Sequence, residues 1–178
     1  MRAEPLPLRG AYILRGAVHA DERGSFRRVM DLEVLRTLEV DVDVAQVSIA
    51  TNTRRGTLRG LHYQAEPHGE AKTLWCTAGA VFDVLVDLRP AEPTFGHLWS
   101  TTLTAGDPVA VHVPRGVAHG YQTLSDSTDL TYVISTPYAT ASACGVNPLD
   151  PTLAIDWPLP VTSMSDRDRD APPWPPSR

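Results

Sequence analysis

The sequence predicts a mainly β fold, an antiparallel sandwich or barrel with a few short helices. Many short segments alternate polar and apolar residues with a period of two, which is typical of half-buried strands. Turn clusters rich in Gly, Pro, Asp and Ser separate these segments at close spacing. A chain of 178 residues is also long enough to bury one hydrophobic core. Together these features favour a single antiparallel β domain.

The N-terminal third is expected to contain a β-rich lead-in followed by a helix. Residues 1–30 include a turn at 21–24, where the sequence reads DERG. Residues 31–38, DLEVLRTL, are the only convincing helical stretch, because three leucines fall at helical spacing. Asp31 stands where an N-cap is needed.

The central part of the chain predicts several strands. The clearest is AVFDVLVDL at 80–88, and further strands are expected at 97–104, 109–113 and 128–134. Asp83 falls on the less apolar face of the first of these strands. Asp87 has the same parity but stands nearer the strand end, so we expect it to face solvent. The predicted domain covers residues 1–170, and residues 171–178 form a proline-rich tail.

Composition argues against several classes of function. The net charge is −5 and no basic cluster exceeds two arginines, so a nucleic-acid-binding protein is not expected. No apolar run reaches about 18 residues, so we expect no membrane segment. The N-terminus has no apolar signal region, which predicts a cytoplasmic protein. The two cysteines form no CxxC pair, so neither a zinc site nor a disulfide framework is expected.

His62 and His119 lie in motifs that are compatible with either metal binding or proton transfer. The sequence PRGVAH, which ends at His119, resembles half of a cupin metal signature. The other half would be HxH, but the chain reads His62-Tyr63-Gln64. Glu66 or His68 would have to replace the missing ligand, so the sequence favours no metal.

Proton transfer is the stronger interpretation of these residues. A histidine is the natural general base near neutral pH, and it needs an acidic partner, for which Asp83 and Asp168 are candidates. Tyr132, taken alone, is better explained as a core residue with its hydroxyl at the rim, but beside a histidine base its phenol is a candidate acid. Lys72 is the only lysine among sixteen basic residues, and its ammonium could stabilise an oxyanion.

Read in order, the motifs closely resemble one family, the dTDP-4-keto-6-deoxyhexose 3,5-epimerases, best known for dTDP-4-dehydrorhamnose 3,5-epimerase. The matching segments are DERGSF (21–26), LRGLHYQ (58–64), AVFDVLVDLR with PTFG (80–96), VPRGVAHGY (113–121), DPTLAIDWP (150–158) and SDRD (165–168). The resemblance covers about residues 10–170 and implies a cupin-like antiparallel β-barrel, or jelly roll. It also implies an enzyme without metal or redox cofactor.

The resemblance assigns roles to individual residues. His62 is the base that removes a proton alpha to the C4 ketone, and Asp168 is its partner. Lys72 stabilises the enolate oxygen and Tyr132 delivers a proton from the other side. Asp83 and His119 support the pocket.

The resemblance also implies how the dTDP-sugar substrate is bound. Arg59 contacts the diphosphate, while Gln46 and Tyr138 lie near the nucleotide. Arg23 and Phe26 reach the nucleotide of the neighbouring subunit. A homodimer with exchanged N-terminal strands is therefore expected.

Four points stay open from the sequence alone. Asp166 and Asp170 compete with Asp168 as partner of His62. Ser48 stands where the family often has asparagine. Strict alternation places Arg59 and His62 on opposite faces of a strand, so both can enter one pocket only if a bulge or a strand end intervenes, for which Gly60 is the candidate position. Epimerisation at C3, at C5 or at both is not decided.

Three rival functions share part of this pattern. A 3,4-ketoisomerase of the same fold would move the ketone away from C4. A non-catalytic nucleotide-sugar-binding barrel would bind without turnover, although such a protein would often have lost one of the candidate catalytic residues. A metal-dependent cupin oxygenase would need the missing ligand.

Overall fold

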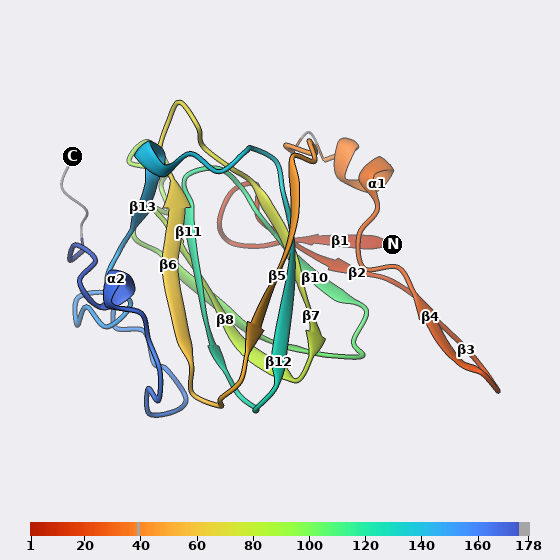
Figure 1. The fold of residues 1–178 in the computed structure, drawn as a ribbon. Coiled ribbons are helices and arrows are strands. Elements are labelled where there is room, and N and C mark those ends of the chain that lie inside the picture. Colours follow the sequence, from red (N-terminus) through yellow and green to blue (C-terminus); the bar gives the residue numbers. More distant parts are fainter. Residues whose placement is uncertain (39, 175–178) are drawn as a thin grey trace.

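Two antiparallel sheets face one another in the computed structural model, which describes residues 1–38 and 40–174 (Figure 1). The first sheet has, in spatial order, β1 (Arg2–Pro5), β2 (Tyr12–Arg15), β10 (Val109–Val113), β7 (Lys72–Ala78), β12 (Thr128–Ile134) and β5 (Gln46–Asn52). The second has β13 (Ala143–Gly145), β6 (Leu58–Gln64), β11 (Val117–Thr123), β8 (Ala80–Asp87) and β9 (Leu98–Thr104). This architecture confirms the prediction of a mainly β, cupin-like jelly roll.

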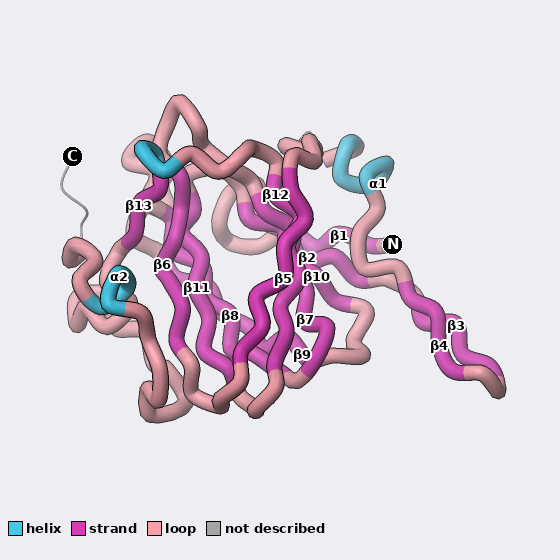
Figure 2. Tube along the Cα trace, viewed as in Figure 1, coloured by secondary structure: helices cyan, strands magenta, loops and turns pink. Residues whose placement is uncertain are grey.

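Few residues lie in helices, as Figure 2 shows. The described helices are α1 (Leu32–Arg36), the 3-10 turn η1 (Thr140–Ser142) and α2 (Asp166–Arg169). Helix α1 begins where the sequence predicts, because the Asp31 carboxylate accepts a hydrogen bond from the backbone N–H of Glu33 at 3.1 Å.

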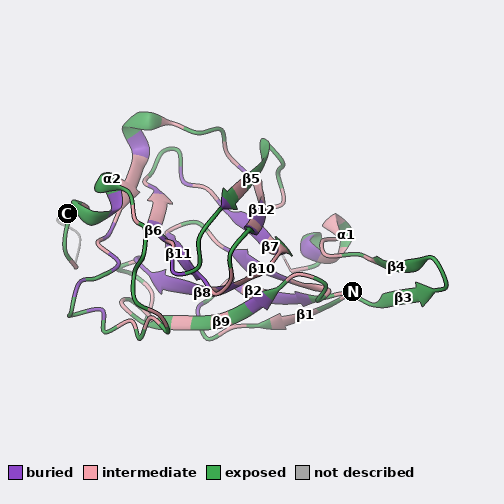
Figure 3. Ribbon diagram, turned by 60° about the horizontal axis from the view of Figure 1, so that its bottom comes forward, coloured by how far each residue is buried: buried purple, intermediate pink, exposed green. Residues whose placement is uncertain are grey.

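A two-stranded hairpin of β3 (Val18–Asp21) and β4 (Gly24–Arg27) projects away from the two sheets (Figure 1). All four residues of β3 are exposed, and Phe26 of β4 is 67% exposed. Figure 3 shows this arm in green against the buried strands of the body. A large aromatic ring in this position lacks the burial that usually holds one in place.

The main core lies between the sheets and takes residues from both (Figure 3). Strand β8 shows how alternation divides its residues: Val81 and Leu85 enter this core, whereas Val84 and Val86 join a second cluster beneath the outer loops. Asp83 shares the inner face and is completely buried. A carboxylate in such a place is costly unless it is hydrogen-bonded.

The expectation that Asp87 faces solvent is wrong. Asp87 is 0% exposed, because the loop after β8 folds back over it. Its carboxylate accepts hydrogen bonds from the guanidinium of Arg89 at 2.7 and 2.9 Å and from the hydroxyl of Thr94 at 2.6 Å. Burial acts to raise the pKa of Asp87, but these donors hold it below its usual value.

The start of the predicted tail lies against the body of the protein. The ring of Trp174 contacts that of Phe95 with centroids 5.2 Å apart, and its backbone N–H donates to Asp150 at 2.7 Å. Residues 175–178, the rest of the predicted tail, lie outside the described residues. Within residues 1–38 and 40–174, no helix is long and apolar enough to cross a membrane.

Candidate active site

A pocket of about 390 Å³ opens between the two sheets, and we call it the inter-sheet pocket. The first sheet contributes Gln46, Ser48, Lys72 and Tyr132 to its lining, and the second contributes Arg59, His62, His119 and Tyr121. Its volume falls in the range of small-molecule sites. Most of the candidate residues named from the sequence therefore meet in one place.

A bulge in β6 brings Arg59 and His62 to the same pocket. His62 pairs with His119 of β11 and Arg59 pairs with Tyr121, so three steps along β6 face two steps along β11. Gly60 lies at the bulge with a φ of +128°, and an added Cβ would stand 2.5 Å from the Cα of Gly120. Glycine is therefore required there. The predicted break in strand alternation is confirmed.

The ring of His62 is held by Asp168. The Nε2–H group of His62 donates to Oδ1 of Asp168 at 2.7 Å, and the backbone N–H of Gly60 donates to the other carboxylate oxygen at 3.2 Å. The neutral ring then carries its lone pair on Nδ1. Burial acts to raise the pKa of Asp168, but the bond from His62 lowers it below its usual value. Asp168 stays ionised near neutral pH and fixes the tautomer of the base.

Helix α2 decides which aspartate reaches the histidine. Ser165 caps this helix by accepting a hydrogen bond from the Asp168 backbone N–H at 3.1 Å, which turns Asp168 inward. Asp166 pairs instead with Arg169 at 2.6 Å, and Asp170 is exposed. Of the three competing aspartates, Asp168 is the one that contacts His62.

A second histidine–aspartate pair lies deeper in the wall of the pocket. The Nε2–H group of His119 donates to Oδ2 of Asp83 at 2.6 Å, and the two side chains are 5% and 0% exposed. The other Asp83 oxygen, Oδ1, is buried without a hydrogen-bond partner among the described residues. This pair is therefore closed to solvent, whereas the His62 side chain is 43% exposed.

Tyr132 is half-buried, faces the pocket from β12 and lies against a group of buried polar side chains. Burial raises the pKa of Tyr132 well above its ordinary value, and the nearby Tyr121 and Asp83 raise it further. Asn52 donates to the Tyr121 hydroxyl at 3.2 Å and accepts from the Arg59 guanidinium at 2.8 Å. Tyr132 thus remains a protonated phenol throughout the neutral range.

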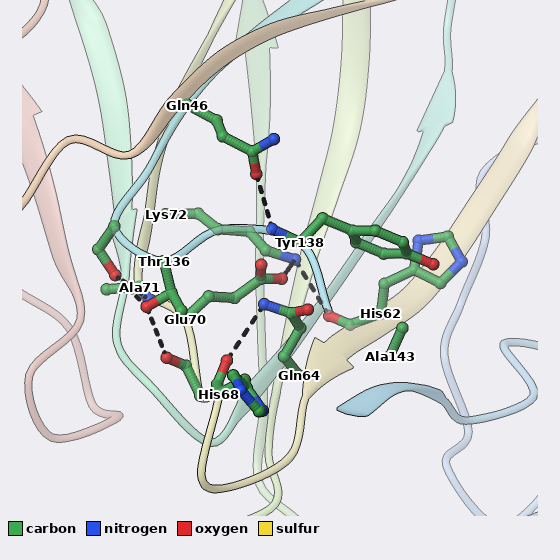
Figure 4. Close-up of polar contacts among 12 residues, drawn as sticks. Gln46, His62, Gln64, His68, Glu70, Ala71, Lys72, Thr136, Tyr138 and Ala143 are labelled. Carbon is green, nitrogen blue, oxygen red and sulfur yellow. Dashed lines mark hydrogen bonds and ion pairs between the residues drawn. The ribbon is translucent and has the colours of Figure 1, made fainter. Parts of the chain in front are cut away.

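Lys72 reaches the pocket from the first residue of β7. Its ammonium lies 2.8 Å from Oε1 of Glu70 and donates to the His62 carbonyl at 3.5 Å (Figure 4). The Lys72 and Glu70 side chains are only 10% and 9% exposed. A cation is thus held beside the backbone of the candidate base.

The outer end of the pocket carries the candidate nucleotide contacts. Gln46 accepts a hydrogen bond from the Tyr138 backbone N–H at 3.0 Å, and the Tyr138 ring is half exposed (Figure 4). Ser48 also lines the pocket, so a residue at this position is placed to contact a ligand.

Two predicted residues lie away from the inter-sheet pocket of their own chain. Arg23 and Phe26 are on the projecting hairpin, where Arg23 pairs with Asp21 at 2.6 Å. Neither side chain lines this pocket.

The residues considered as extra metal ligands also lie elsewhere. Glu66 is exposed, and the His68 ring is hydrogen-bonded to the Ser142 hydroxyl at 3.0 Å. Across the part of the chain that the structure describes, no three His, Cys, Asp or Glu side chains gather as metal ligands would.

Comparisons with known proteins agree on one family. The sequence profile described as dTDP-4-dehydrorhamnose 3,5-epimerase matches residues 5–175. The chain belongs to this family. It is 38% identical to a curated dTDP-4-dehydrorhamnose 3-epimerase of Streptomyces niveus over 172 residues, covering 96% of this chain and 83% of the relative. It is also 38% identical to the dTDP-4-dehydrorhamnose 3,5-epimerase of Mycobacterium tuberculosis over 176 residues, covering 97% and 87%.

Solved structures of the epimerase family show the same fold. The M. tuberculosis epimerase superposes with a TM-score of 0.92 at 37% identity, covering 97% of this chain and 88% of that one. A 3'-monoepimerase from Streptomyces bikiniensis, solved in complex with dTDP-quinovose, superposes with a TM-score of 0.88 at 38% identity, covering 95% and 86%. The predicted family is confirmed.

The sequence analysis did not single out Glu70 and Tyr121, which line the pocket, or Asn52, which bonds to Tyr121 and Arg59 behind it. Glu70 has the same parity as Lys72, which is the one signal that could have placed both on the same side of the chain. Tyr121 likewise has the parity of His119 on β11. Asn52 is far from both in sequence and carries no such signal.

Proposed function

We propose that this protein epimerises a dTDP-4-keto-6-deoxyhexose by proton transfer next to the C4 ketone, for deoxysugar biosynthesis (rhamnose or an antibiotic sugar). One observation carries this proposal. A histidine base stands on β6 of one sheet, and a protonated phenol, Tyr132, stands on β12 of the facing sheet. Inversion at carbon needs a proton to leave from one face and another to arrive at the opposite face. Two facing sheets supply both groups.

The first step removes the proton alpha to the ketone. Nδ1 of His62 takes this proton, and Asp168 stabilises the imidazolium that forms. Negative charge then develops on the ketone oxygen. The Lys72 ammonium, held next to the His62 backbone, stabilises this enolate oxygen.

The second step returns a proton from the other side. Tyr132 donates the proton of its hydroxyl to the enolate carbon, and the ketone re-forms as the oxygen loses its negative charge. The raised pKa of Tyr132 keeps its proton available throughout the neutral range. His119 and Asp83, buried beside Tyr132, support this wall of the pocket.

Substrate binding is proposed to follow the length of the inter-sheet pocket. Arg59 binds the diphosphate through its guanidinium, while Gln46 and Tyr138 contact the nucleotide base at the outer end. Relatives are named as acting on dTDP-sugars, and one was solved with dTDP-quinovose.

A homodimer is proposed to complete the nucleotide site. The projecting hairpin presents Arg23 and the exposed ring of Phe26 to a partner, and we propose that they reach the partner's nucleotide. The edge strand β5 adds exposed Val47 and Ile49, an apolar face suited to subunit contact. We also propose a cytoplasmic location, because Cys76 and Cys144 are free thiols, as is usual in a reducing compartment.

The test is proton NMR of dTDP-4-keto-6-deoxyglucose incubated with the protein in deuterium oxide. Deuterium at C3, C5 or both, in a product that keeps its ketone at C4, is the expected result, and the exchanged position gives the regiochemistry. Tyr132→Phe should slow product formation while exchange catalysed by His62 continues. A ketone at C3 would show a ketoisomerase instead, and bound nucleotide without any exchange would show a binding protein.

A further inference from the structure

Glu70 forms an ion pair that the proposed mechanism does not use. Its Oε1 lies 2.8 Å from Nζ of Lys72, and both side chains are about nine-tenths buried (Figure 4). Both residues line the inter-sheet pocket. We propose that Glu70 is a positioning residue that holds the Lys72 ammonium in place for the enolate oxygen. This inference rests on the proposed function.

The chemistry of lysine explains why such a partner is needed. Its ammonium ends a flexible four-carbon chain, and a buried charge is costly unless it is paired. An ammonium has three N–H donors. Among the described residues, the ammonium forms an ion pair with Glu70 and one hydrogen bond, to the His62 carbonyl at 3.5 Å, so an N–H remains for a ligand oxygen.

The backbone is hydrogen-bonded both before and after Glu70. The carbonyl of Gly69 accepts a hydrogen bond from the Thr136 hydroxyl at 2.9 Å, and the Ala71 backbone N–H donates to the Ser135 hydroxyl at 2.9 Å (Figure 4). These bonds tie the backbone around Glu70 to the residues that follow β12. A carboxylate on a fixed backbone can fix a flexible cation.

The contact to His62 places the ammonium where the reaction needs it. The ketone oxygen and the proton removed by His62 belong to neighbouring carbon atoms of the substrate. A cation held beside the His62 backbone can therefore approach the oxygen while the ring approaches the proton. Without Glu70, the Lys72 ammonium would lose its ion-pair partner and sample more rotamers.

A double-mutant cycle separates positioning from a merely structural role. Glu70→Gln keeps the shape and an acceptor oxygen but removes the charge. We expect it to lower kcat about 10-fold with KM changed by less than about 2-fold, and Lys72→Met to lower kcat about 100-fold. In the Lys72→Met background, Glu70→Gln should cost nothing further, because Glu70 acts through Lys72.

Two further variants serve as controls for the double-mutant cycle. Glu66→Gln alters an exposed carboxylate in the same loop and should leave kcat unchanged. Glu70→Asp keeps the charge on a shorter side chain and should retain more activity than Glu70→Gln. Equal losses from Glu70→Gln in both backgrounds, or no loss in the wild-type background, would overturn the proposal.

A spectroscopic measurement tests the Glu70–Lys72 ion pair without relying on activity. Lys72 is the only lysine, so lysine labelled with ¹⁵N gives a single side-chain ammonium signal. We expect a slowly exchanging signal in the wild type and in Glu66→Gln, and its loss in Glu70→Gln. An unchanged signal in Glu70→Gln would contradict the proposal. If the wild type were inert on the keto sugar, the proposed function would fail, while this signal would still show whether Glu70 holds Lys72.

Discussion

The two histidine–aspartate pairs of this protein stand side by side on β6 and β11, yet their surroundings differ. His62 and His119 are direct cross-strand partners, and each donates through Nε2 to an aspartate at 2.6–2.7 Å. The His62 side chain is 43% exposed at the pocket, whereas that of His119 is only 5% exposed. Equal hydrogen bonds therefore do not mean equal roles. A base must exchange its proton with both substrate and solvent, and His62 is better placed for this than His119, which lines the same pocket from a buried position.

The difference arises from where each aspartate lies in the chain. Asp83 is part of strand β8, so its pair is sealed between strands of one sheet. Asp168 comes from the short helix α2, which approaches β6 from outside the sheets. Asp168 therefore orients His62 without closing over it.

The largest expected effect comes from removing the exposed base. His62→Asn should lower kcat by about 1,000-fold or more, since a positioned general base contributes about 10²–10⁴. Binding of dTDP should stay within about 3-fold of wild type, because the nucleotide contacts lie elsewhere. Steady-state kinetics and calorimetric titration with dTDP measure these two quantities. A kcat within 10-fold of wild type would remove His62 from the base role.

The next largest effect tests the aspartate on α2. Asp168→Asn should lower kcat about 100-fold, because the amide does not stabilise the imidazolium as a carboxylate does. Asp170→Asn is the matched control, since its side chain is exposed two residues away, and its kcat should be unchanged. Equal losses in the two variants would mean that α2 acts only by its packing.

Breaking the buried His119–Asp83 pair should lower the stability of the fold more than breaking the His62–Asp168 pair does. His119→Ala leaves the Asp83 carboxylate buried without its donor, which should lower the free energy of unfolding by about 3 kcal/mol. Asp168→Ala should cost less stability, since its partner histidine is partly exposed. Urea denaturation of both variants at neutral pH measures the difference. A larger loss of unfolding free energy in Asp168→Ala than in His119→Ala would contradict the structural role assigned to the buried pair.

A second buried histidine, besides His119, sharpens the comparison, because its ring bonds to a hydroxyl rather than to a carboxylate. His112 on β10 is hydrogen-bonded to Thr73 at 2.9 Å, and burial lowers its pKa to about 4, although the Asp41 charge acts in the other direction. The unfolded chain, with a histidine pKa near 6.5, binds more protons than the folded protein between about pH 6.5 and 4. Stability should therefore fall as the pH drops through this window.

The size of this effect follows from the shift. A difference of about 2.5 pKa units at 1.36 kcal/mol per unit gives a loss of about 3 kcal/mol by pH 4. His112→Gln should flatten the pH dependence between pH 6.5 and 4, while kcat at neutral pH stays near the wild-type value. Thermal unfolding followed across this range checks the prediction. An equally steep pH dependence in the variant would assign the loss to another group.

The sequence predicted the sheets and much of the site for physical reasons that particular residues illustrate. Period-two alternation placed Asp83 on the inner face of β8, and Gly60 marked the bulge that unites Arg59 with His62. Spacing alone did not decide among Asp166, Asp168 and Asp170, because the choice depends on how Ser165 caps α2 more than a hundred residues after His62. Asp87 was misplaced because a loop covers it, and alternation carries no information about loops.

The measurement that tests the central claim most directly is deuterium exchange catalysed by the two histidine variants. Wild type, His62→Asn and His119→Asn would each be incubated with dTDP-4-keto-6-deoxyglucose in deuterium oxide, and the sugar protons followed by NMR. The account predicts exchange in the wild type, slower but measurable exchange in His119→Asn, and none in His62→Asn. Exchange that persists in His62→Asn and disappears in His119→Asn would contradict it and would make the buried pair the site of proton removal.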